Sequence, residues 1–140
     1  MDLDRTIGIA ASGLEAQSGR MRVIAENLAN ADSTAPQAGG EPYRRKIPTF
    51  ASQFHADLDA RVVGLGRIVR DRSAFRRDYE PGNPATDAKG GYVRLPNANL
   101  LVEQIDMRGM QRSHEANLDV IGAARRMIAR ILDILRGDGT

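Results

Sequence analysis

The stretch NANLLVEQIDMRGMQRSHEANLDVIGAARRMIARILDILR, residues 97–136, decides the fold of this chain. Its apolar residues recur every three or four positions, which predicts an amphipathic α-helix over many turns. At about 1.5 Å per residue, such a helix is about 57 Å long. The predicted seam comprises Leu100, Met107, Met110, His114, Asn117, Leu118, Ile121, Ile128, Ile131 and Leu135. A small core cannot cover this stripe, so we expect a partner helix along it, from this chain or from another copy.

A second helix is predicted over residues 2–31. Three glycines inside it, Gly8, Gly13 and Gly19, cost on the order of 2–3 kcal/mol together relative to alanine. Its predicted seam comprises Ile7, Ala11, Leu14, Met21, Ile24 and Leu28. We therefore expect this helix to be weak alone and to depend on packing.

The ends of both helices carry recognisable signals. Asp2 or Asp4 can cap the first helix, and Asn97, after Pro96, is the predicted N-cap of the second. Gly137 is the predicted stop of the second helix.

Polar residues on and near the long seam admit more than one interpretation. Asn117 either fixes the register of a helix pair, as buried polar residues do in coiled coils, or is a partly solvated position. His114 is interpreted as an interface histidine, because no set of three or more ligands accompanies it. The acidic pair of Glu103 and Asp106 is interpreted as ordinary surface charge.

The middle of the chain, residues 35–96, is punctuated by glycine and proline and predicts short strands and loops. Extended segments are predicted at Tyr43–Phe54, at Val62–Val69 with an interruption at Gly64 and Gly66, at Phe75–Tyr79, and at Tyr92–Leu95. The predicted fold is mainly α-helical with a small β-rich insert, the long terminal helices being paired as a coiled coil. Residues 1–34 and 97–140 would form one helical core domain around the insert.

Composition excludes several classes of protein. The 140 residues include 20 basic and 18 acidic side chains, for a net charge of +2, and no cysteine. Thiol catalysis and thiolate metal sites are therefore excluded, and no catalytic constellation, metal site or cofactor motif is found. No apolar run approaches the roughly 18 residues of a membrane span. The N-terminus lacks the pattern of a cleaved secretory signal, so we expect a cytosolic chain or one exported without such a signal.

Several motifs together resemble one family. The segment ASGLEAQSGRMRVIAENLANADS (residues 11–33) is similar to the N-terminal signature of bacterial flagellar axial proteins. GEPYRRK (residues 40–46), DYEPGNPATDAKGGYV (residues 78–93) and YVRLPNANLLVEQIDMRGMQRSHEANLDVI (residues 92–121) narrow the likeness to the basal-body rod family, nearest to its proximal-rod members. The most telling motif residues are Asn27, Leu28, Ala29, Asn30 and Asp32.

The resemblance implies a structural subunit that assembles through its terminal helices into the drive shaft crossing the periplasm and transmitting torque. It implies a central insert that faces outward, and export through the flagellar type III apparatus without cleavage. The implied partners are copies of this chain, other rod proteins, inner-membrane ring and export-gate components at the rod base, and the periplasmic bushing ring.

Other classes remain as alternatives. The first is a soluble coiled-coil adaptor, which would stay in the cytosol. The second is a weak nucleic-acid binder, suggested by the arginine clusters; the near-zero net charge and the scarcity of aromatic residues argue against it, and we expect no nucleic-acid partner. An enzyme is the least favoured.

Overall fold

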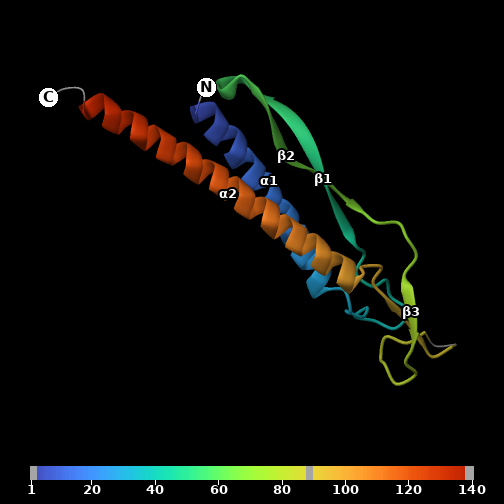
Figure 1. Ribbon diagram of the computed structural model, residues 1–140. Helices are drawn as coiled ribbons and strands as arrows, with labels where there is room; N and C mark the ends of the chain where they lie inside the picture. Colours follow the sequence, from blue (N-terminus) through green and yellow to red (C-terminus); the bar gives the residue numbers. More distant parts are fainter. Residues whose placement is uncertain (1–2, 88–89, 138–140) are drawn as a thin grey trace.

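A computed structural model of the chain describes residues 3–87 and 90–137. Two long helices, α1 (Leu3–Ala29) and α2 (Leu100–Gly137), lie side by side and antiparallel, and a β-hairpin runs along α1 (Figure 1). The prediction of two long terminal helices around a small strand-containing insert is therefore confirmed. No helix in the described ranges is long and apolar enough to cross a membrane.

Helix α1 is the central layer, with α2 on one side and the hairpin on the other (Figure 1). Its fully covered residues therefore lie on two faces rather than on one stripe. They are Ala10, Ala16, Val23, Ile24 and Asn27. Of the predicted caps, Asp4 falls in the first turn, and Asp2 lies outside the described residues.

Helix α2 begins at Leu100, and the prediction that Asn97 is its N-cap is wrong. Asn99 does this work, because its Oδ1 accepts the backbone N–H groups of Leu101 at 3.0 Å and Val102 at 3.4 Å. The Asn97 side chain is held elsewhere, since its Oδ1 accepts the backbone N–H of Arg45 at 2.7 Å. The helix ends at Gly137, the predicted stop.

The hairpin consists of β1 (Lys46–His55), a 3-10 turn (Ala56–Leu58) and β2 (Ala60–Arg70), with antiparallel pairing. The expected interruption at Gly64 and Gly66 is wrong, because β2 continues through both. Gly66 is required for the pairing: a Cβ there would lie 2.7 Å from Thr49 Oγ1, near the irregularity in β1 between Pro48 and Phe50.

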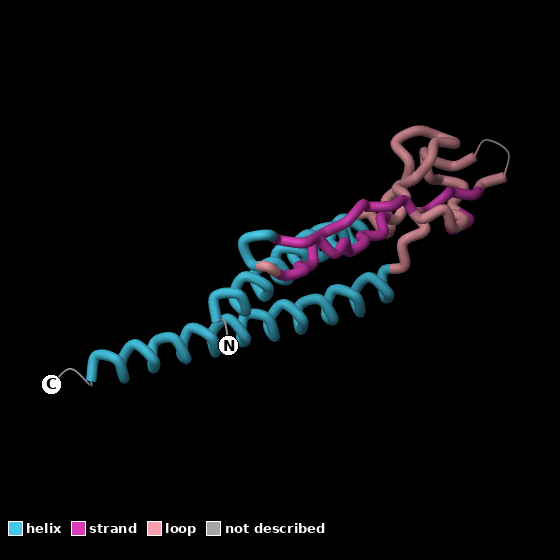
Figure 2. The backbone as a smooth tube through the Cα atoms, turned by 90° about the horizontal axis from the view of Figure 1, so that it is seen from above, coloured by secondary structure: helices cyan, strands magenta, loops and turns pink. Residues whose placement is uncertain are grey.

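A second antiparallel ribbon, β3 (Arg76–Tyr79) with β4 (Tyr92–Leu95), lies at the end of the molecule where α1 ends and α2 begins (Figures 1 and 2). The rings of Tyr79 and Tyr92 face each other edge to face, with centroids 5.3 Å apart. This ribbon leads directly into α2.

At the opposite end, α2 extends beyond the start of α1 (Figure 2). Leu3, the first residue of α1, shares a surface depression with Met127 and Ile131. The last turns of α2 therefore have no α1 residue beside them. Ile134 and Leu135 are 65% and 68% exposed there.

Candidate functional site: the junction and seam of the helix pair

One asparagine joins three elements where α1 ends. Asn27 is 1% exposed and uses all of its side-chain hydrogen-bonding groups. Its Oδ1 accepts from the Lys46 backbone N–H and the Tyr43 hydroxyl, each at 2.9 Å. Its Nδ2 donates to the Lys46 carbonyl at 2.8 Å and to Glu103 Oε2 at 3.1 Å. The side chain therefore ties α1 to β1 and to α2.

The same junction holds a buried charge. Glu103 is 1% exposed, and its Oε1 accepts from Arg45 Nε at 2.5 Å. Burial lowers the pKa of Arg45, but the hydrogen bond and charge of Glu103 raise it, and the net pKa lies above its ordinary value. The interpretation of Glu103 as surface charge is wrong. Its place on the heptad line that includes Ala124, the other buried residue of α2, is the sequence signal that reveals it.

The family-like motif continues the junction beyond Asn27. Asn30 Nδ2 donates to the Glu26 carbonyl at 2.8 Å, which closes the helix end. Arg76 of β3 donates to the Ala31 carbonyl at 2.7 Å and to Asp32 Oδ1 at 3.1 Å. Leu28 and Ala29 make no such bond and are half-buried and exposed, respectively. The polar residues of the motif thus attach the second ribbon to the end of α1.

A more exposed ion pair at the junction predicts acid sensitivity. Glu26 Oε2 accepts from Lys46 Nζ at 2.6 Å, and this hydrogen bond lowers the pKa of Glu26. The backbone N–H of Ser73 likewise lowers the pKa of Asp71. A carboxyl whose pKa is lower in the folded state stabilises the fold above its unfolded pKa, and this contribution is lost as the pH falls through the folded pKa.

We therefore expect the thermal midpoint to fall below about pH 4, the ordinary range of carboxyl pKa values. The double variant Glu26→Gln/Asp71→Asn should show a shallower acid-side decline than the parent in thermal unfolding followed by circular dichroism. An unchanged decline would mean that these carboxylates do not contribute. The pKa of Lys46 is raised by the same hydrogen bond, so its contribution should be lost only as the pH rises above about 10.

The predicted seam residues occupy the contact face between the helices and its flanks. On α1, Ile24 is buried, four residues are half-buried and Ala11 is exposed; the half-buried ones are Ile7, Leu14, Met21 and Leu28. On α2 the half-buried residues are Met107, Met110, His114, Asn117, Ile121 and Ile128. The exposed residues are Leu100, Leu118, Ile131 and Leu135.

The register of the helix pair is marked by a polar contact at mid-length. Asn117 Nδ2 donates to Gln17 Oε1 at 3.2 Å across the seam. Gly13 makes room for it, because a Cβ at this position would lie 3.0 Å from Asn117 Nδ2. Of the two interpretations of Asn117, the contact favours a residue that sets the register.

The other two glycines of α1 face the hairpin. A Cβ at Gly8 would lie 2.6 Å from Leu58 Cδ2, and one at Gly19 would lie 2.8 Å from Leu65 Cδ2. The cost of the glycines in helix propensity is thus the condition for close contact between α1 and the hairpin.

A matched pair of variants tests this role. Gly19→Leu should lower the free energy of unfolding by about 1–3 kcal/mol, because the larger side chain overpacks the contact with the hairpin. Gly109→Leu should raise it by up to about 1 kcal/mol, because Gly109 is exposed on α2 with nothing within 4 Å of its Cβ position. Urea unfolding of both variants makes the comparison. Equal effects would show that only helix propensity is at work.

These features define a class of protein: an elongated helix pair whose buried polar groups fix the geometry of its elements. The described part of the chain holds no cluster of three or more potential metal-ligating side chains. The fold and the site therefore describe a structural subunit.

Comparison with known proteins gives the family. Residues 7–36 match the model of the family described as flagella basal body rod protein. The chain is 45% identical over 128 residues to flagellar basal-body rod protein FlgC of Agrobacterium fabrum, covering 91% of both chains. It is 37% identical over 135 residues to FlgC of Yersinia enterocolitica, covering 96% of this chain and 98% of the relative. FlgC of Bacillus subtilis is 37% identical over 144 residues, with coverage of 92% and 95%.

The chain belongs to the FlgC family of flagellar basal-body rod proteins. It is a structural protein of bacterial motility located in the flagellar basal body, and not an enzyme.

Proposed function

We propose that the helix pair is the module through which this subunit polymerises into the rod. The observation that carries the proposal is the exposure of α2: of its 38 residues, only Glu103 and Ala124 are buried. Its exposed large apolar residues are Leu100, Leu101, Val102, Ile105, Leu118, Val120, Met127, Ile131, Leu132, Ile134 and Leu135. An apolar surface of this extent is a mark of association with other chains.

The helical core comprises residues 1–34 and 97–140, with residues 35–96 as the outward-facing insert. Within the core, α1 and α2 pair as a coiled coil along the predicted seams. The exposed seam members, such as Leu118 and Leu135, are free to pack against helices of neighbouring subunits. Burial of each large apolar side chain stabilises an assembly by roughly 1.5–3 kcal/mol, which offsets the entropy of ordering a loosely held helix.

The neighbours are other rod proteins and further copies of this chain. Ring and export-gate components of the inner membrane lie at the rod base, and the bushing ring surrounds the rod in the periplasm. The subunit passes through the flagellar type III apparatus without cleavage. The assembled shaft crosses the periplasm and transmits torque.

Fractionation of motile cells tests this function against the adaptor alternative. A C-terminally tagged chain that replaces the native one should be recovered in purified basal bodies, with an uncleaved N-terminus by mass spectrometry. Loss of the flagellar export gate should retain it in the cytosol. If the chain stayed in the cytosol of motile cells, the rod proposal would be wrong and an adaptor would be favoured.

A further inference from the structure

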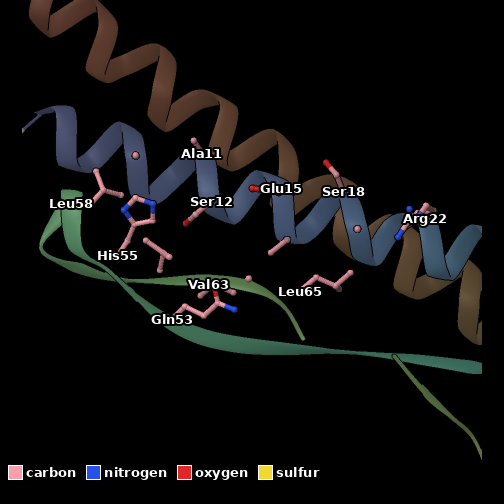
Figure 3. A pocket seen from close by; sticks show the side chains of 15 residues that line it. Ala11, Ser12, Glu15, Ser18, Arg22, Gln53, His55, Leu58, Val63 and Leu65 are labelled. Atoms are coloured by element: carbon pink, nitrogen blue, oxygen red, sulfur yellow. The ribbon is translucent and has the colours of Figure 1, made fainter. Parts of the chain in front are cut away.

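An open groove of about 900 Å³ separates α1 from the hairpin (Figure 3). On the α1 side its wall is built mainly of small residues at helical spacing, including Gly8, Ala11, Ser12, Ser18 and Gly19. The opposite wall is the hairpin, which touches α1 closely through Leu58 and Leu65. Because its helical wall lacks bulk, the groove can receive large apolar side chains from another helix.

The chain also carries a surface of the complementary kind. Along α2, the apolar or small residues of one flank follow each other at intervals of three, four or seven, a helical spacing. This outer stripe comprises Val102, Ile105, Gly109, Ala116, Val120, Met127 and Ile134. Its large members are between 44% and 65% exposed. Helix α1 lies between the hairpin and α2, so the stripe and the groove of one chain are on separate sides of the molecule (Figures 1 and 3).

The charges beside the two surfaces match in one direction. Glu15 and Arg22 are exposed on the groove wall, seven residues apart. Arg126 and Asp133 are exposed beside the outer stripe, also seven residues apart. When the two helices run parallel, Glu15 faces Arg126 and Arg22 faces Asp133. An antiparallel approach in the same place brings like charges together.

We propose that the groove of one subunit receives the last turns of α2 from a second copy of this chain. This inference rests on the proposed assembly function and adds the two surfaces and the direction of the contact. The outer stripe supplies Met127 and Ile134 as anchors, and the two ion pairs set the register. Because two different surfaces meet, the contact is head to tail, and repetition with a non-closing rotation builds a helical polymer.

Disulfide trapping tests the contact, and the absence of native cysteine leaves no background. Two single-cysteine copies, Ser18→Cys and Met127→Cys, are expressed together in cells that lack the native chain. Each copy has one thiol, so any bond between the two positions joins two subunits. Mild oxidation of purified basal bodies should give a mixed dimer. The matched control replaces Met127→Cys with Ala129→Cys, an exposed position on another face of the same turn, and should give several-fold less dimer.

A charge exchange provides an independent readout. Glu15→Arg and Arg126→Glu should each reduce swimming, and their combination in one chain should restore it, because every contact then regains a pair of opposite charges. Absence of the dimer in basal bodies that contain both cysteine variants would overturn the contact while leaving the rod function standing. Failure of the charge exchange to restore swimming would also overturn it. Recovery of the wild-type chain only from the cytosol would instead contradict the proposed function itself.

Discussion

Asn27→Ala should reduce the free energy of unfolding by about 3 kcal/mol, because each buried hydrogen-bonding group left without a partner costs about 1–3 kcal/mol. The variant removes the acceptor of the Lys46 N–H and the Tyr43 hydroxyl, and it removes a donor to the buried carboxylate of Glu103. Urea unfolding of the purified protein, followed by circular dichroism, measures the loss.

The matched control is Asn30→Ala, one turn further along the same chain segment. Asn30 is half-buried, and its side chain donates to the Glu26 carbonyl. Loss of one such bond should cost about 1 kcal/mol. If the two variants were equally stable, Asn27 would be an ordinary helix-end residue and the junction would not hold the three elements together.

Ile121→Asp should abolish swimming in cells that depend on the variant chain. Ile121 is half-buried on the seam face of α2, four residues from Asn117. A carboxylate at that position loses its hydration against an apolar surface without a partner, which is costly for an ionised group. The helix pair should then separate, and the subunit should be missing from purified basal bodies on immunoblots.

Arg72→Asp is the control, because it introduces the same residue at an exposed position before β3. Cells that carry it should swim and should show normal incorporation of the subunit. Equal impairment by both substitutions would count against the helical seam as the assembly surface.

Helical periodicity predicted both long helices closely, because their apolar spacing is sustained over many turns. The end signals were less informative. Asn97 and Asn99 are both good N-caps by residue type, and the tertiary contact of Asn97 with Arg45 decided between them. Such a contact joins residues far apart in sequence, and periodicity does not report it.

The junction was harder to predict, because it is polar. Glutamate is usually exposed, and Glu103 is buried only because Arg45 and Asn27 meet it from two other elements. The glycines of α1 were a visible signal that propensity alone could not interpret. Gly8 and Gly19 are eleven residues, or about three turns, apart and therefore share a face. That face is the one against which the hairpin packs.

The central claim is that α2 is loosely held in the free subunit and becomes covered in the rod. Hydrogen exchange with mass spectrometry, on the purified subunit and on isolated basal bodies, tests it most directly. Peptides from residues 118–137 should exchange rapidly in the free subunit and slowly in basal bodies. Peptides around Asn27 and Glu103 should be protected in both. Equal protection of residues 118–137 in the two states would contradict the account, because the exposed face of α2 would then not be the surface on which the rod is built.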